Sequence, residues 1–162
     1  SLLKHIDTGL RETYSEKIEL IPCALEKTFQ TKNWTIVPLL ANHATELHEE
    51  FTLHYLICGK TKKILYALDG AWMTTHARKH LEGLHLDAVI WDATMEISGD
   101  WRIFEHNDLS MIITLSHALS DRKIITESTI QILDHLAHTL WREPVRVPAP
   151  FIAAFDGMTV NL

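Results

Sequence analysis

Short apolar runs, separated by turn residues, dominate the chain and predict strands that alternate with helices. Proline at the end of the first run is expected to stop that strand, because proline cannot donate to a sheet ladder. The turn Gly59–Lys62 separates two such runs and predicts a β-hairpin. The predicted strands are Trp34–Pro38, Phe51–Cys58, Lys63–Leu68, Asp87–Asp92 and Thr129–Leu133.

Two helices are expected between these strands. Thr74 or Thr75 is a suitable N-cap for a helix that runs to Leu84. Asp108 precedes the apolar segment Leu109–Leu115, which predicts a second helix packed on the sheet. The chain up to about residue 32 is expected to be a helix or an irregular lead-in. Strands interleaved with helices indicate an α/β layered fold with a mixed sheet.

Composition narrows the class of protein. The chain has 162 residues, 46% of them hydrophobic, a size and content that suit one globular domain. A net charge of -6 argues against binding nucleic acid by bulk electrostatics. Two cysteines outside any paired motif favour a reducing cytoplasm, and no apolar run approaches the ~20 residues that cross a bilayer.

The candidate functional residues are polar side chains that follow directly after the apolar runs. The chain contains 11 histidines, and His43, Asp69 and His135 each follow a predicted strand. Taken singly, His43 is better explained as a loop histidine bonded to the backbone, and Asp69 is equally a simple turn residue. Their shared position at strand ends is the stronger signal, since imidazoles and a carboxylate suit Zn, Mn or Fe in a hydrolytic site.

Several other histidines favour a structural interpretation. His76 and His80 are four residues apart on the predicted helix, but no glutamate stands beside His76 to complete a zinc-protease motif. A solvated helix face is therefore expected there. His48 and His54 are expected on a strand or its approach, in structural roles.

The ordered motifs resemble those of the metallo-β-lactamase-fold hydrolases, in particular the phosphodiesterase branch with ribonuclease Z and the cyclic phosphate phosphodiesterases. The resemblance extends from about residue 30 to the end of the chain. It rests on the segments Ala41–Ala44, Ile64–Gly70, Trp91–Met95, Glu105–Asn107 and Leu133–His138.

Two departures from the family pattern shape the expected fold. The family's first metal motif, His-x-His-x-Asp-His, is absent, and Asp134 stands where threonine is common. The chain is thus either the C-terminal half of a longer hydrolase or a degenerate relative without metal, and the start at Ser1 favours the first. The expectation is one domain, residues 1–162, forming the C-terminal part of an incomplete αββα sandwich.

The resemblance implies a metal-dependent hydrolase in which a metal-bound hydroxide cleaves a phosphodiester. Two zinc or manganese ions are implied, with His43 and His135 as terminal ligands and Asp69 as a bridging and catalytic ligand. This chain alone is expected to be inactive and to hold metal only weakly.

Further roles follow from the same resemblance. His106 is expected at the rim of the site, contacting the phosphate or protonating the leaving oxygen, with Asp92 orienting it. Asn107 and His138 are the other expected substrate contacts.

Two other functions stay open at this point. One is a non-catalytic domain that uses the same fold for binding or assembly. The other is hydrolysis of a thioester or lactam, against which the Asp92-Ala93-Thr94 segment and His106 favour a phosphodiester. The expected partner is a small-molecule or nucleotide phosphodiester, with no membrane, and a homodimer is left open.

Overall fold

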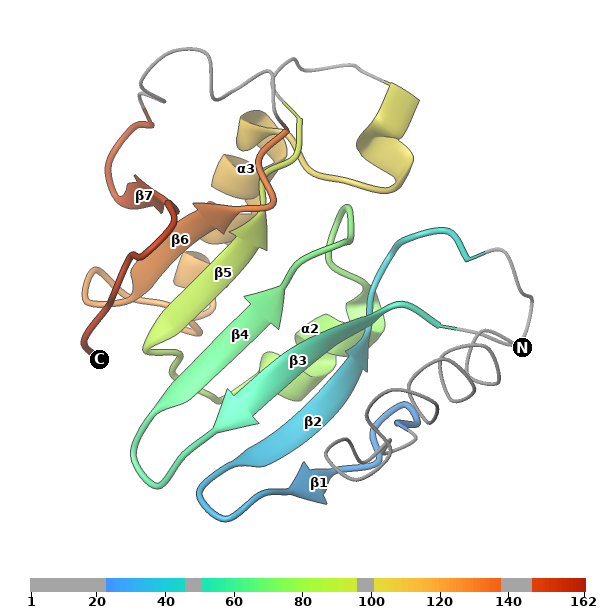
Figure 1. Ribbon diagram of the computed structural model, residues 1–162, viewed down its shortest axis with the longest axis vertical. Coiled ribbons are helices and arrows are strands. Elements are labelled where there is room, and N and C mark those ends of the chain that lie inside the picture. Colours follow the sequence, from blue (N-terminus) through green and yellow to red (C-terminus); the bar gives the residue numbers. More distant parts are fainter. Residues whose placement is uncertain (1–22, 46–50, 96–100, 138–146) are drawn as a thin grey trace, which may run out of the picture.

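The computed structural model describes residues 23–45, 51–95, 101–137 and 147–162, and these form a mixed sheet with helices (Figure 1). The strand order is β1-β2-β3-β4-β5-β6-β7. The strands are β1 (Phe29–Gln30), β2 (Thr35–Leu40), β3 (Leu53–Cys58), β4 (Lys63–Ala67), β5 (Ala88–Asp92), β6 (Ile130–Asp134) and β7 (Phe151–Ala153). The helices are α2 (Thr75–Leu81), the short 3-10 helix η1 (Trp101–Phe104) and α3 (Leu109–Asp121). Residues 1–22 of the expected lead-in lie outside the described residues.

The sheet changes character at β4. Strands β1 to β4 pair antiparallel, whereas β4 to β7 pair parallel, so the predicted mixed sheet is confirmed. The predicted hairpin is β3 and β4, and Gly59 N donates to Lys62 O at 2.7 Å in its turn. Helix α2 connects β4 to β5 and α3 connects β5 to β6. Figure 1 shows both helices behind the sheet, on one face, as crossovers of one hand require.

The prediction that Pro38 stops its strand is wrong. Pro38 lies inside β2. The short strand β1 pairs only with Thr35 and Ile36, so beyond it this side of β2 has no strand partner. The carbonyl of Pro38 faces the same side, because it accepts from Glu26 N at 3.1 Å. The missing N–H therefore falls on a side where no ladder bond is required.

Both helices start at the predicted caps. The Thr74 hydroxyl accepts from Ala77 N, and the Asp108 carboxylate accepts from Met111 N at 2.8 Å. Helix α3 continues to Asp121, beyond the apolar run that ended at Leu115, because Leu119 adds another buried turn.

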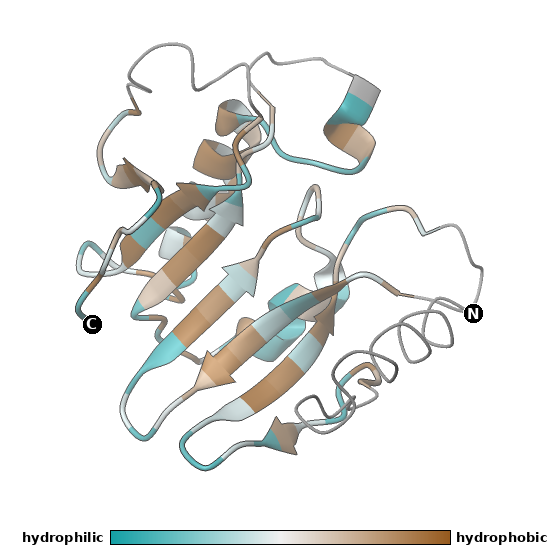
Figure 2. Cartoon of the chain, viewed as in Figure 1, coloured by the Kyte–Doolittle hydropathy of each residue, from teal (hydrophilic) through white to brown (hydrophobic). Residues whose placement is uncertain are grey.

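The core lies between the sheet and the two helices. Leu65, Val89 and Trp91 on the sheet pack in one cluster with Leu81 of α2 and Ile112 of α3. Figure 2 shows strands that are mostly hydrophobic, whereas hydrophilic residues lie in turns, in loops and on helix α2. The opposite face of the sheet is also apolar but more open, and there Tyr66 is 38% and Ile152 42% exposed.

Candidate metal centre

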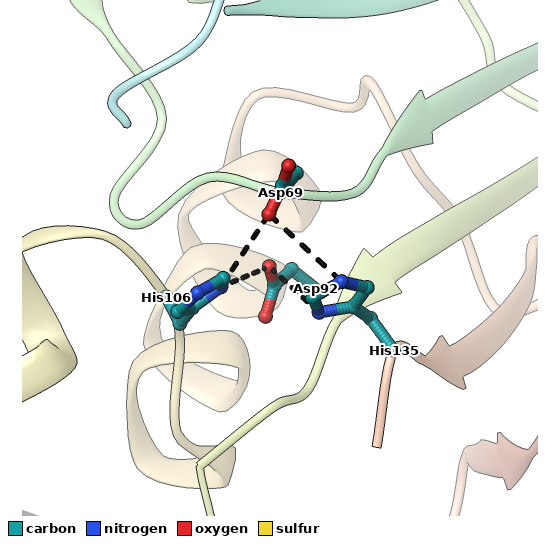
Figure 3. Close-up of side chains that lie close together, drawn as sticks. All are labelled: Asp69, Asp92, His106 and His135. Carbon is teal, nitrogen blue, oxygen red and sulfur yellow. Dashed lines mark hydrogen bonds and ion pairs between the residues drawn. The ribbon is translucent and has the colours of Figure 1, made fainter. Parts of the chain in front are cut away.

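The candidate residues gather at one edge of the sheet because of the strand directions. β4, β5 and β6 are parallel, and β2 runs the same way as β4 since both are antiparallel to β3. The carboxyl ends of parallel strands meet at one edge, which is where open α/β sheets place their sites. Asp69, Asp92 and His135 come from the ends of β4, β5 and β6, and Figure 3 shows them facing one another together with His106.

Asp69 is the point at which the imidazoles converge. Its Oδ1 lies 3.4 Å from His43 Nε2, 3.8 Å from His135 Nε2 and 3.9 Å from His106 Nδ1. Its side chain is 53% exposed, so the carboxylate faces open space at the sheet edge. The backbone has φ 57°, in the left-handed region that non-glycine residues rarely adopt. Strained backbone of this kind concentrates at functional sites.

Asp92 has the opposite environment. The side chain is fully buried, and Oδ1 accepts from Thr94 N at 3.0 Å and from the Thr94 hydroxyl at 2.8 Å. Oδ2 accepts from Gly70 N at 3.2 Å and from His106 Nδ1 at 2.9 Å. These donors satisfy both oxygens of the buried carboxylate. Asp92 therefore orients its neighbours, as expected for His106.

Thr94 extends this orientation to His135. Thr94 Oγ1 lies 2.5 Å from His135 Nδ1 and 2.9 Å from the His135 carbonyl. Because the hydroxyl proton is directed to Asp92 or to that carbonyl, the imidazole Nδ1–H is the donor in the remaining contact. The Nε2 lone pair of His135 then faces Asp69. His135 also has positive φ, 59°.

His106 is more central than the sequence had suggested. Its side chain is 13% exposed, against 21% for His43 and 42% for His135, so the expected rim position is wrong for the described residues. Its ring lies 5.1 Å from that of His43 and 5.3 Å from that of His135, measured between centroids. The segment after β5 that carries it is tied to Gly70, since Asn107 Nδ2 donates to Gly70 O at 2.8 Å.

The remaining site predictions have different outcomes. Asn107 is buried, so its predicted contact with substrate stays a prediction, and His138 lies outside the described residues. Glu105 had no predicted role as a ligand, yet it joins His43 and His106 in an adjoining group of possible ligands. The sequence included Thr94 in the segment Trp91–Met95 but did not predict that its hydroxyl contacts His135.

The side chains around Asp69 Oδ1 fit a divalent cation, with the buried Asp92 beside them. Asp69, Asp92, His106 and His135 each offer one ligand atom, all within 4.8 Å of one another. Ligand atoms held at about 2.0–2.2 Å by a tetrahedral ion lie about 3.4 Å apart. The contacts of 3.4–3.9 Å around Asp69 Oδ1 are near this separation and too long for direct hydrogen bonds.

Behind this cluster lies a buried histidine, His54 of β3. It is 3% exposed, and neither ring nitrogen has a hydrogen-bond partner among the described residues. Burial lowers the pKa of His54 to about 4, although Asp92 and Asp69 act in the opposite direction. Gly70 packs against this ring, where a Cβ would lie 2.5 Å from His54 Nε2.

A separate cavity of about 250 Å³ lies between α3 and the segment that leads into β7. It is lined by Ser116, His117, Gln131 and Phe151, among others. None of its lining residues belongs to the cluster around Asp69, so the cavity is not the candidate metal centre.

Comparison with solved structures shows the fold. A diphosphatase from the PhnP family aligns with TM-score 0.68 and 18% identity, over 97% of this chain and 52% of that one. Zn²⁺-bound PqqB from Methylobacterium extorquens gives 0.69 and 16%, over 99% and 62%. Human tRNase Z, short form, gives 0.60 and 15%, over 99% and 64%. No family model and no curated protein sequence matches the chain.

The chain therefore has the metallo-β-lactamase fold in partial form, as the sequence motifs predicted. It spans about half to two thirds of the length of these structures. Among the described residues, no helix combines the length and apolar character needed to cross a membrane.

Proposed function

We propose that the full-length protein is a metal-dependent hydrolase that cleaves a phosphodiester at the sheet edge around Asp69. The observation that carries the proposal is the approach of three imidazoles, from His43, His106 and His135, to one carboxylate oxygen of Asp69. Imidazole nitrogens suit zinc, and a carboxylate oxygen suits zinc or manganese.

A divalent cation bound there would polarise a phosphoryl oxygen and lower the pKa of bound water to about 7. His43, Asp69 and His135 are the proposed ligands, and we propose zinc or manganese, two ions in all. The chain's own residues prepare this site: Thr94 holds the Nδ1 side of His135, so that Nε2 faces Asp69.

His106 is the proposed general acid. Its Nδ1–H donates to the buried Asp92 carboxylate, which fixes the orientation of the ring. The other ring nitrogen, Nε2, can then carry the proton that a leaving oxygen requires. Asn107 supports this loop through Gly70, and we propose that its neighbourhood, with His138, contacts the substrate.

The substrate class is inferred from two sources. Two of the aligned structures are a diphosphatase and tRNase Z, whose names indicate phosphate-containing substrates. The buried Asp92, with Thr94 beside His106, is the arrangement that we associate with binding a phosphate. We propose a small-molecule or nucleotide phosphodiester as substrate and the cytoplasm as the location. A non-catalytic binding or assembly domain is the alternative.

The test is hydrolysis of bis(p-nitrophenyl) phosphate by the full-length protein with added zinc or manganese. His106→Ala should lower kcat by ~100-fold or more, the scale of a lost general acid, with metal content unchanged. Asp69→Ala should lose metal and activity together. His117→Ala, an exposed histidine on α3, is the matched control and should behave as wild type.

Three outcomes would contradict the proposal. If His106→Ala emptied the metal site, His106 would be a ligand and not the acid. If it left turnover intact, the assignment of His106 would be wrong. If the metal-loaded wild type hydrolysed no phosphodiester, the alternative of a binding domain would replace the proposal.

A further inference from the structure

A second cluster of possible metal ligands lies away from the sheet edge, between the segment before β1 and helix α2. It consists of Glu26, His76 and His80, and each offers a ligand atom within 4.8 Å of the other two. It shares no residue with the centre around Asp69. The sequence had suggested a solvated helix face for the two histidines, but their side chains are only 35% and 32% exposed.

Strand β2 holds both sides of this cluster in place. Glu26 N donates to Pro38 O at 3.1 Å, and Glu26 has a left-handed backbone with φ 60°. The Thr74 hydroxyl, at the start of α2, donates to Leu40 O at 2.9 Å. These acceptors are two residues apart on one strand. The carboxylate and the helix that carries the histidines are therefore positioned by the same rigid element.

The hydrogen bond of His80 Nδ1 leaves its Nε2 free to bind a metal ion. His80 Nδ1 lies 3.1 Å from the carbonyl of His76, and because a carbonyl only accepts, the proton is on Nδ1. In the neutral imidazole Nε2 then carries a lone pair, and it lies 3.9 Å from Glu26 Oε1. A ring nitrogen bound to a backbone carbonyl is the arrangement that fixes a metal-binding tautomer.

His76 completes the arrangement. It is one helical turn from His80, and the two rings lie 4.9 Å apart between centroids. His76 Nε2 directly contacts Glu26 Oε1. Its Nδ1 is buried and has no hydrogen-bond partner among the described residues. The side chain is thus oriented by packing and by Glu26, with Nε2 at the centre of the cluster.

We propose that Glu26, His76 and His80 bind a zinc-type divalent cation that links the segment before β1 to helix α2. Two imidazoles and one carboxylate suit Zn²⁺, Co²⁺, Ni²⁺ or Cu²⁺ and not Mg²⁺ or Ca²⁺, which take oxygen ligands. Solvent reaches the cluster, so water completes the coordination. The ion closes a loop of 50 residues between Glu26 and His76 and therefore stabilises the folded protein.

The test is Zn²⁺ binding to the full-length protein, measured by equilibrium dialysis and by thermal unfolding with and without Zn²⁺. His80→Ala and Glu26→Gln remove a ligand, and Glu26→Gln preserves the shape of the side chain. His85→Ala, an exposed histidine just beyond the same helix, is the matched control. His135→Ala removes a proposed ligand of the centre around Asp69. This variant therefore distinguishes an ion bound at Glu26, His76 and His80 from an ion bound around Asp69.

Wild type and His85→Ala should bind one more Zn²⁺ than His80→Ala and Glu26→Gln, whose affinity at this cluster should fall by ~100-fold. The rise in Tm caused by Zn²⁺ should shrink by roughly 5 °C in both ligand variants. The ion should persist in His135→Ala. Equal Zn²⁺ binding by wild type, His80→Ala and Glu26→Gln would overturn the proposal. The cluster would then be explained by the direct contact between Glu26 and His76 alone. Loss of the ion in His135→Ala would also contradict it.

Discussion

At the scale of single residues, two aspartates at neighbouring strand ends have opposite environments, and this difference separates their roles. Asp92 is fully buried and accepts hydrogen bonds on both oxygens, whereas Asp69 is 53% exposed and is surrounded by imidazole nitrogens. A carboxylate saturated by protein donors has no lone pair well placed for an ion, while an exposed one does. Asp92 is therefore the orienting residue and Asp69 the proposed ligand.

Gly70 connects Asp69 to the layer beneath it. The backbone of Gly70 donates to Asp92 and accepts from Asn107, and an added Cβ would lie 2.5 Å from His54 Nε2 and 3.4 Å from Ala41 Cβ. Gly70→Ala should lower the free energy of unfolding by about 1–3 kcal/mol, because the buried ring has little room to move. Denaturant unfolding measures this change.

A double variant isolates the cause. With His54→Ala the obstructing ring is gone, so Gly70→Ala should cost much less in that background than in wild type. Costs that simply add, within about 0.5 kcal/mol, would mean that the ring is not what excludes a side chain at Gly70.

His54 also predicts a pH dependence of stability. Its pKa is about 4 when folded and 6.5 when exposed, because burial disfavours the charged imidazole. Above pH 6.5 both states are neutral and the full stability is present. As the pH falls from 6.5 to 4 only the unfolded state takes up the proton, so the free energy of unfolding falls by about 3 kcal/mol.

The measurement is urea unfolding of wild type, His54→Leu and the exposed control His117→Leu between pH 7 and pH 4, with a chelator present. Other groups titrate in all three proteins, so the difference between variants is the informative quantity. His54→Leu should lose part of the decline that wild type and His117→Leu show. A decline of the same size in His54→Leu would show that His54 is protonated in the folded protein.

At the residue scale, the sequence predicted candidate site residues only where a polar side chain directly follows a predicted strand. Asp69, His43 and His135 could be predicted because each follows an apolar run, and strand ends converge in an α/β sheet. Glu26 could not be predicted, since it belongs to no periodic pattern and meets His76 only after 50 residues of chain have folded. The central position of His106 depends on the hydrogen bond to Asp92, which sequence spacing does not reveal.

At the scale of elements, caps and turns determine where the chain leaves the sheet. Asp108 begins α3 and also lies beside Met95 in an isolated β-bridge, so this cap joins the helix to the loop that carries His106. Caps and hairpins were predictable because their signals are local. The continuation of β2 through Pro38 was not, because it depends on which side of the strand lacks a neighbour.

The cap of α3 carries its own prediction. Asp108→Ala should lower the free energy of unfolding by about 1–2 kcal/mol, because Met111 N and the Ser110 hydroxyl lose their acceptor. Thr114→Ala, an exposed position on the same helix, should change it by less than about 0.5 kcal/mol. Thermal unfolding compares the two. Equal effects would mean that the Asp108 carboxylate does not act as the cap.

At the scale of the whole molecule, the described residues form a sheet with helices on one face and an apolar second face. The motif pattern allowed the partial metallo-β-lactamase fold to be predicted, and the aligned structures, of which this chain spans 52–64%, agree. What covers the second face could not be predicted, because an apolar pattern indicates that a face is covered but does not identify its partner. The weak metal binding expected of this chain alone stays a prediction.

The central claim is that the sheet edge around Asp69 is a metal centre. Anomalous diffraction from crystals of the full-length protein grown with Zn²⁺ or Mn²⁺ tests it most directly. The account predicts a peak about 2.0–2.2 Å from Asp69 and from His135 Nε2, and no such peak in Asp69→Ala crystals. Fully occupied metal elsewhere in the protein, with no peak in contact with Asp69 or His135, would contradict the account.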